Sequence, residues 1–204
     1  MTGTRPPAAL SGGVALLERA LGYALGQLHA VTSADLSRPT PCREWDLRGL
    51  LIHMDDSLTA LQEALDLARV GPAAAAGRAD PAYGPAGSAV SLTGTLRAHA
   101  GRLLGALAGA GEQLVWVGGF PVPASVVASA GAVDLAVHGW DVGRACGRAQ
   151  PIPEPLAEEM LQIVPLLVTC ADRPALFAPP VPVPRLASAS DRLIGYLGRD
   201  PATG

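Results

Sequence analysis

Leucine, valine and alanine recur at steps of three and four residues along most of the chain, which is the spacing of amphipathic helices. Stretches rich in glycine and proline interrupt the pattern and mark where helices end. The pattern predicts helices over residues 11–31, 46–69, 88–110, 123–146 and 154–170, with a short final helix over 189–197. These elements predict an all-α fold, most simply a four-helix bundle with a short C-terminal extension.

The segments between the predicted helices carry signals of their own. Prolines in the segment SRPTPCREW, residues 37–45, exclude a helix and favour an extended path. Asp46 follows this segment, and an aspartate just before an apolar helical stripe is a typical N-cap. Glycine and proline predict a loop over residues 70–87, and the run QLVWV at 113–117 is β-like. Gly147 marks the end of the fourth main helix.

Length and composition indicate one domain. The chain has 204 residues, of which 49% are hydrophobic, so we take residues 1–204 as a single domain, with the first ten residues disordered. Mean hydropathy is +0.29, yet no apolar run approaches the ~18 residues of a membrane span. The N-terminus also lacks the apolar core of a signal peptide. We therefore expect a cytoplasmic protein that does not bind membranes.

Charge and cysteine content indicate which binding partners and which cellular compartment to expect. The net charge is −3 and no basic stripe is present, so we expect no nucleic-acid binding. The three cysteines, Cys42, Cys146 and Cys170, form no CxxC pair, which favours free buried thiols in a reducing compartment. All 15 basic residues are arginine, and lysine and asparagine are absent. Since both missing residues have adenine-rich codons, the coding sequence is inferred to be GC-rich.

Candidate metal ligands lie on two of the predicted helices. Asp134 and His138 are four residues apart, so on a helix they point the same way. A carboxylate and an imidazole are ligands that divalent transition metals accept, and His53 on the second helix could supply a third. Three protein ligands leave one coordination position open, as in catalytic sites. The alternative is an ordinary Asp134–His138 pair, with His53 a hydrogen-bonded histidine at the core boundary.

Other polar and aromatic residues near these positions have competing interpretations. Asp141 lies three residues after His138 and could orient its imidazole, or could be a solvated acid near the helix end. His99 could be a satisfied core histidine, a pocket wall or a further ligand, in that order of preference. Trp45 and Trp140 are interpreted as packing residues rather than substrate platforms.

At these residues the sequence resembles a known family. TPCREWDLRGLLIHM and DLAVHGWDVGRACG resemble two motifs of the actinobacterial DinB-like metal-binding proteins related to the N-terminal domain of mycothiol-dependent maleylpyruvate isomerase. RLIGYLGRDP is similar to the usual ending of that group. The motifs keep their order and spacing, and the resemblance runs from about residue 11 to 201. It implies a DinB-like four-helix bundle that is often a homodimer.

The resemblance also implies a metal site. A divalent metal, commonly zinc, is held in this group by a helix-two histidine and by a carboxylate and a histidine of a later helix. By position these residues are His53, Asp134 and His138. The isomerase typically has glutamate where Asp134 stands, so the carboxylate of this chain is shorter by about one methylene. Related families use the metal to bind mycothiol or bacillithiol, and the GC-rich coding sequence fits an actinobacterial host, in which mycothiol is the expected thiol.

Three hypotheses for function follow. The leading one is a zinc-dependent S-transferase or isomerase that uses mycothiol and a small electrophile, with Arg97 and Arg144 as candidates to meet a carboxylate group. The second is a thiol-independent metal hydrolase, lyase or cyclase of a biosynthetic pathway, in which water replaces the thiol. The third is a non-enzymatic metal-binding protein.

Overall fold

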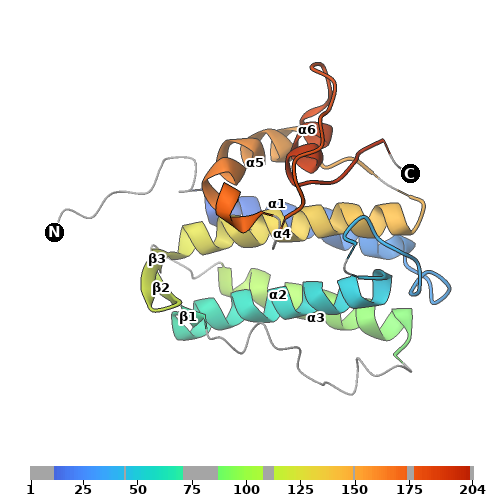
Figure 1. Cartoon of the computed structure of the whole chain (residues 1–204). Coiled ribbons are helices and arrows are strands. Elements are labelled where there is room, and N and C mark those ends of the chain that lie inside the picture. The colour runs from blue at the N-terminus through green and yellow to red at the C-terminus, as the bar shows by residue number, and fades with distance from the viewer. Residues whose placement is uncertain are drawn as a thin grey trace.

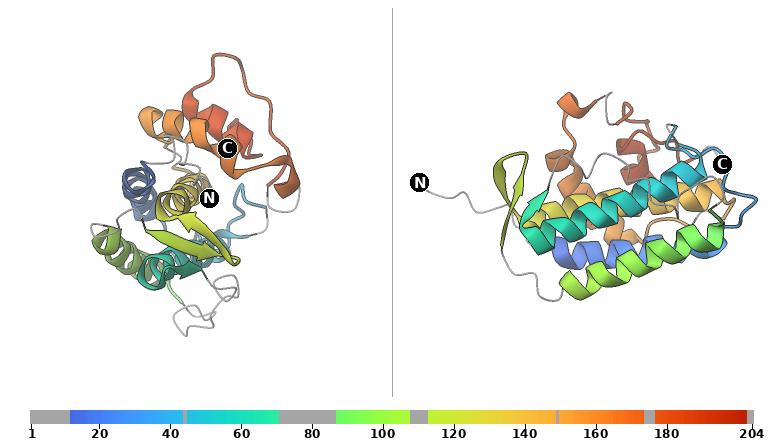
Figure 2. Two further views of the ribbon diagram at one scale, coloured as in Figure 1. Left: turned by 90° about the vertical axis from the view of Figure 1, so that its left-hand side faces the viewer. Right: turned by 90° about the horizontal axis from the view of Figure 1, so that it is seen from below.

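Four helices form the body of the molecule (Figure 1). In this computed structural model, α1 (Gly13–Gln27) packs along α4 (Ala124–Ala145), and α2 (Leu47–Leu67) packs against both α4 and α3 (Ala89–Leu107). Seen nearly end-on, the four helices surround one hydrophobic core (Figure 2). This arrangement confirms the predicted all-α bundle.

The structure describes residues 12–43, 45–70, 87–107, 113–148, 150–173 and 177–202, without the side chains of residues 69 and 70. The predicted disorder of the first ten residues, most of the predicted loop at 70–87 and the last three residues of the predicted helix over 88–110 lie outside these ranges. Within the described ranges, no helix is both long and apolar enough to cross a membrane.

The signals at helix ends act as predicted. The Oδ1 atom of Asp46 accepts a hydrogen bond from the backbone N–H of Gly49 at 2.8 Å and so caps α2. The apolar stripe of α2 is buried from Leu47 to Leu61. Gly147, just beyond α4, has a φ of +66°, the left-handed conformation that ends helices. The chain thus enters α2 and leaves α4 in fixed directions, and these two helices carry the candidate ligands.

A small sheet at one end of the bundle was predicted only in part. β2 (Leu114–Val117) is the predicted β-like run, and it pairs antiparallel with β3 (Phe120–Pro123) and parallel with β1 (Arg69–Val70). Sequence reasoning missed β3 because two of its four residues are prolines, which are tolerated only at sheet edges. The predicted helix over 46–69 was two residues too long, since α2 ends at Leu67.

The C-terminal extension lies over the bundle as a further layer. α5 (Glu154–Leu167) packs mainly against α6 (Ala189–Tyr196), with further contacts to α1 and α4. The predicted helix over 154–170 ends three residues early, two residues after Pro165, which lies inside the last turn of α5. The chain continues past α6 and returns toward α4, and this return brings one more residue to the candidate site (Figure 1).

Two glycines allow α1 and α4 to approach closely. A Cβ atom on Gly13 would lie 1.9 Å from the carbonyl oxygen of Ser125, and one on Gly139 would lie 2.9 Å from the Cα of Ala24. Both distances are too short for a real side chain. Because Gly139 is the neighbour of His138, this close contact also fixes the position of a candidate ligand against a rigid partner helix.

Candidate metal centre

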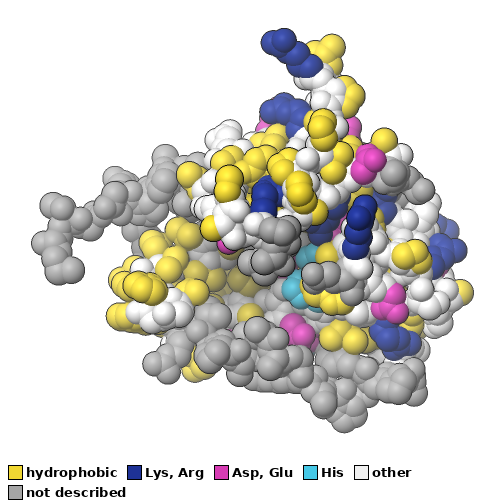
Figure 3. Space-filling view, viewed as in Figure 1, with side chains coloured by type: hydrophobic (Ala, Val, Ile, Leu, Met, Phe, Trp, Pro, Cys, Tyr) yellow, Lys and Arg dark blue, Asp and Glu magenta, His cyan; other side chains and the backbone are white. Residues whose placement is uncertain are grey.

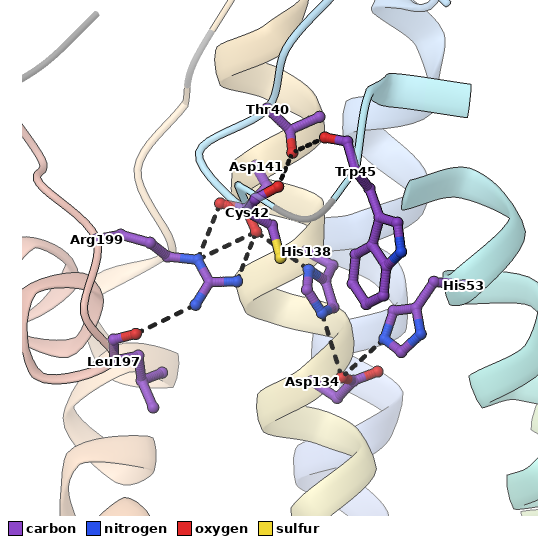
Figure 4. A network of polar contacts seen from close by, with 9 residues as sticks. All are labelled: Thr40, Cys42, Trp45, His53, Asp134, His138, Asp141, Leu197 and Arg199. Atoms are coloured by element: carbon purple, nitrogen blue, oxygen red, sulfur yellow. Dashed lines mark hydrogen bonds and ion pairs between the residues drawn. The ribbon is translucent and has the colours of Figure 1, made fainter. Parts of the chain in front are cut away.

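Three side chains from α2 and α4 converge between these helices (Figure 4). The Oδ1 atom of Asp134 lies 3.6 Å from Nε2 of His53 and 3.4 Å from Nε2 of His138. One donor atom from each residue lies within 4.8 Å of the other two. The structure therefore brings together the three residues that the sequence singled out, although they lie far apart along the chain. Metal binding by them remains a prediction.

One oxygen of this cluster is unsatisfied. The Oδ2 atom of Asp134 is shielded from solvent and accepts no hydrogen bond from the described residues. A buried acceptor without a partner costs free energy, and the cost is larger for a charged group. A divalent cation would satisfy it, and two imidazoles with one carboxylate form a donor set that zinc accepts. The residues present therefore fit a divalent cation.

Behind His138 lies a second carboxylate that is fully satisfied. The Oδ2 atom of Asp141 lies 3.1 Å from Nδ1 of His138. Arg199 donates to the same carboxylate from Nε at 3.0 and 3.1 Å and from Nη2 at 2.8 Å. The Asp141 side chain is completely buried, and that of Arg199 is only 10% exposed. The interpretation of Asp141 as a solvated acid is therefore wrong. Arg199 comes from the segment after α6, and sequence reasoning missed it.

Charges around His138 shift the pKa values of the cluster. Burial alone would lower the pKa of His138, but the carboxylates of Asp134 and Asp141, one at each ring nitrogen, raise it to about 9. Burial alone would raise the pKa of Asp134, but the imidazoles of His138 and His53 lower it far below its ordinary value. Before a cation binds, the cluster therefore holds an anionic Asp134 beside a cationic His138. A cation must displace the His138 proton.

The segment before α2 supports the ligands from one side. The Trp45 ring stacks on the His53 ring with centroids 4.3 Å apart and meets the His138 ring edge-on at 5.9 Å. The hydroxyl oxygen of Thr40 lies 2.8 Å from the carbonyl oxygens of both Cys42 and Trp45, which ties this segment together. Trp45 thus packs as predicted, and the group against which it packs is the candidate centre.

Cys42 belongs to a second, overlapping group of possible donors. A ligand atom from each of Cys42, His138 and Asp141 also lies within 4.8 Å of the other two. The expected free thiols are confirmed for all three cysteines, but their predicted burial is wrong: Cys42 and Cys146 are half-buried and Cys170 is exposed. Sequence reasoning missed Cys42 as a neighbour of the site. The signal was its position in the same motif as Trp45.

A cavity of about 510 Å³ adjoins the three ligands, and Asp134 and His138 are part of its wall. The rest of the wall comes from α2, β2, β3, α4, the end of α5 and the C-terminal segment. Histidine side chains are visible on this face of the molecule, with hydrophobic side chains gathered over the hairpin beside them (Figure 3). An apolar stripe on α4 with steps of three and four residues also lines this cavity: Val126, Ala130, Val133 and Val137.

Three other predicted site residues lie elsewhere. His99 on α3 faces α2, where its Nδ1 lies 2.7 Å from Oδ1 of the buried Asp55. It is a core-boundary histidine and not a wall of the cavity. Arg97 is also on α3, which contributes none of the described residues around the cavity. Arg144 lies over the Trp140 ring and donates to the carbonyl oxygen of Pro201. Neither arginine is among the described residues that line this cavity, and their predicted contact with a carboxylate group stays a prediction.

The fold and the site define a helical bundle that places donors suited to a divalent metal in the wall of a cavity. Residues 17–143 match the family described as the mycothiol maleylpyruvate isomerase N-terminal domain. The match covers more than half of the chain, so the chain belongs to this family, and the predicted resemblance is confirmed. No curated protein and no solved structure matches the chain. All three candidate ligands lie in the matched range, and Arg199 lies outside it.

Proposed function

We propose that the protein is a divalent-metal-dependent enzyme that uses a low-molecular-weight thiol, mycothiol in the first instance, for S-transfer to or isomerisation of a small electrophile. One observation carries the proposal: His53, Asp134 and His138 converge beside a cavity, and one oxygen of Asp134 is buried without a partner among the described residues. The family to which the chain belongs has mycothiol in its description, which supports the choice of thiol.

Each residue of the site has a part in this proposal. His53, Asp134 and His138 would hold the cation, most simply Zn²⁺. Asp141 accepts the N–H of His138 at Nδ1 and so directs Nε2 toward Asp134, as carboxylates behind metal-binding histidines do. Against the effect of burial, the hydrogen bond from His138 and then the charged guanidinium of Arg199 keep the pKa of the Asp141 carboxyl low. Trp45 fixes the plane of the His53 ring by stacking.

A divalent cation lowers the pKa of a thiol bound to it and so supplies thiolate at neutral pH. In S-transfer, the thiol proton passes to solvent, the thiolate sulfur forms a bond to the electrophilic carbon, and the leaving group departs with its electron pair. In an isomerisation, the thiolate sulfur adds to a carbon–carbon double bond and the electron pair moves to the neighbouring electron-withdrawing group. The former double bond, now single, rotates, and the carbon–sulfur bond then breaks, which restores the double bond in the other configuration and releases the thiolate. The apolar wall beside Asp134 excludes water, which would otherwise solvate the thiolate.

The test begins with metal content and thiol binding. We expect protein purified without chelators to carry about one zinc per chain by elemental analysis and to bind mycothiol in calorimetry. His138→Ala removes one ligand and is expected to lose both the metal and thiol-dependent turnover of a model electrophile such as chlorodinitrobenzene. The matched control is His29→Ala, because His29 is an exposed histidine at the end of α1 whose ring contacts the carbonyl oxygen of Gly26.

Three outcomes would contradict the proposal. Unchanged metal content and turnover in His138→Ala would remove the metal centre from the mechanism. Turnover that is equally fast without added thiol would favour a metal-dependent hydrolase, lyase or cyclase. Absence of both metal and mycothiol binding in the unmodified protein would favour a non-enzymatic role.

A further inference from the structure

The wall of the cavity beside the candidate metal centre consists almost entirely of apolar side chains. Valines contribute to it from three elements, including Val117 of β2, Val122 of β3 and Val126 of α4, and from the residue just after α5. Larger apolar side chains complete it: Leu61, Leu167, Phe177 and Leu197. Ser57 is the one described uncharged polar side chain in the wall. A ligand deep in this cavity therefore meets almost no hydrogen-bonding partner.

Among the described residues of the wall, no cationic side chain is left unpaired for an anionic ligand. Of the described lining residues, Asp134, His138 and Arg199 are charged or can become so. The guanidinium of Arg199 already makes three hydrogen bonds to the buried carboxylate of Asp141. His138 lies between two carboxylates. In the proposed function the thiol takes the open position of a bound cation, so a carboxylate of a substrate would lose its hydration shell in the rest of the cavity without gaining a counter-charge, and that loss is costly.

The size of the cavity limits the ligand. Its volume of about 510 Å³ equals the liquid volume of about 17 water molecules at about 30 Å³ each. This is in the lower part of the range of pockets for small molecules, roughly 300–1,000 Å³. A chain or ring system of about 10 to 15 non-hydrogen atoms would fill it.

We propose that the cavity takes an uncharged, mainly apolar substrate, whose electrophilic atom lies at the end lined by Asp134 and His138. This inference rests on the proposed function for the identity of the reacting end. It differs from what the name of the family implies, because maleylpyruvate is a dicarboxylate. The polar part of a sugar-bearing thiol then lies outside the apolar part of the cavity, toward solvent.

The test uses three nine-carbon probes that differ in charge: 2-nonanone, nonanoate and azelate, which carry no, one and two negative charges. Binding is measured by calorimetry on the zinc-loaded protein and on the metal-free protein, without thiol. On the metal-free protein we expect the ketone to bind at least about tenfold more tightly than azelate, with nonanoate between them, because only the ketone has no charge that must be desolvated. Equal or tighter binding of azelate to the metal-free protein, or no binding of the ketone, would overturn the inference. The zinc-loaded protein shows how far a cation at the site offsets this cost for the two acids.

Two variants locate the binding in this cavity. Val126→Arg introduces a cation into the half-buried wall and is expected to weaken ketone binding by about tenfold and to strengthen azelate binding. Val90→Arg is the matched control, because Val90 is 81% exposed on α3 and does not line the cavity. Ketone binding that is unchanged in Val126→Arg would also overturn the inference.

The design separates the inference from the proposed function. Ketone binding requires neither thiol nor turnover, so a protein that binds the ketone but transfers no thiol would contradict the proposed function alone. A protein that transfers thiol to maleate and does not bind the ketone would contradict the substrate class alone.

Discussion

Two aspartates on α4 lie seven residues apart, about two helical turns, and they have opposite environments. Asp141 is completely buried, and its oxygens meet the guanidinium of Arg199 and the imidazole of His138. Asp134 is about one-third exposed and lies beside two imidazoles, yet its Oδ2 atom has no hydrogen-bond donor among the described residues. The same residue type thus forms one saturated contact and one incomplete contact.

This difference separates a positioning residue from a candidate ligand. A saturated carboxylate has no free lone pair in a suitable place for a cation, and its loss leaves a buried arginine unpaired. A carboxylate with a shielded, unpartnered oxygen is costly to the folded protein unless something else binds there. The site therefore has two halves. We call Asp141 with Arg199 the fixed half and Asp134 with the cavity the open half, and His138 contacts both aspartates.

The largest expected effect is on metal binding at the open half. Asp134→Asn keeps the shape of the side chain and removes its negative charge. Mutating a residue that only hydrogen-bonds to a metal ligand typically lowers metal affinity roughly 10–100-fold, and we expect a larger loss here because Asp134 is itself a proposed ligand. Elemental analysis after dialysis checks this. Asp66→Asn is the control, because Asp66 is an exposed aspartate of α2 that contacts only Gln62 in the described structure. Retention of stoichiometric zinc by Asp134→Asn would contradict the assignment.

The fixed half is expected to respond in stability more than in metal binding. Asp141→Asn leaves the guanidinium of Arg199 buried without its carboxylate, which typically costs about 3–5 kcal/mol. We expect a similar loss in the free energy of unfolding measured in urea, together with a roughly 10–100-fold loss of metal affinity. The double variant with Arg199→Gln removes the buried charge as well and is expected to recover part of the stability. A loss below about 1 kcal/mol in Asp141→Asn would show that Arg199 finds another partner.

The third prediction concerns pH and His138, which joins the two halves. In the metal-free protein the pKa of His138 is raised from 6.5 to about 9. The pairing of the His138 cation with Asp134 and Asp141 therefore stabilises the fold fully below pH 6.5, and this stabilisation is lost as the pH rises through about 9. Metal binding needs the deprotonated ring, so we expect zinc affinity to rise about tenfold per pH unit between pH 6.5 and 8, with one proton released.

Calorimetry in two buffers of different ionisation enthalpy measures that proton. The melting temperature of the metal-free protein is expected to fall between pH 6.5 and about 9, the window set by the two pKa values of His138, while that of the zinc form does not. His29→Ala is expected to leave both profiles unchanged. A zinc affinity that is flat between pH 6.5 and 8 would show that His138 is already neutral in the metal-free protein.

The bundle and the open half of the site are the parts that the sequence predicts well. Both depend on short-range spacing: Asp46 caps the helix that follows it, and Asp134 and His138 share a face because they are four residues apart. His53 lies far away along the chain: the sequence offered it as a possible third ligand, and the resemblance to a known family implied the same grouping.

The fixed half depends on tertiary structure, and local pattern does not reveal it. Arg199 is 58 residues from Asp141, and nothing in its local spacing distinguishes it from the other fourteen arginines. Arg144, next to the ligand motif along the chain, is the more obvious candidate, but its side chain lies over Trp140. The sequence also does not show what the apolar stripe of α4 faces, because valines that line an apolar cavity have the same spacing as valines that pack in a core.

The smallest expected effect distinguishes the two overlapping groups of donors. The guanidinium of Arg199 already donates hydrogen bonds to both oxygens of Asp141. A cation held by Cys42, His138 and Asp141 would therefore be repelled by this guanidinium and would have to break its ion pair with Asp141. The group with His53 and Asp134 has no such competitor among the described residues, and it has an unsatisfied oxygen. We therefore expect Cys42→Ser to keep stoichiometric zinc, with an affinity within about threefold of the unmodified protein, a difference of about 0.7 kcal/mol. Cobalt substitution provides an independent check, because a thiolate ligand adds an intense near-ultraviolet absorption band that imidazole and carboxylate ligands lack. The presence of that band in the unmodified protein and its loss in Cys42→Ser would move the metal to the fixed half.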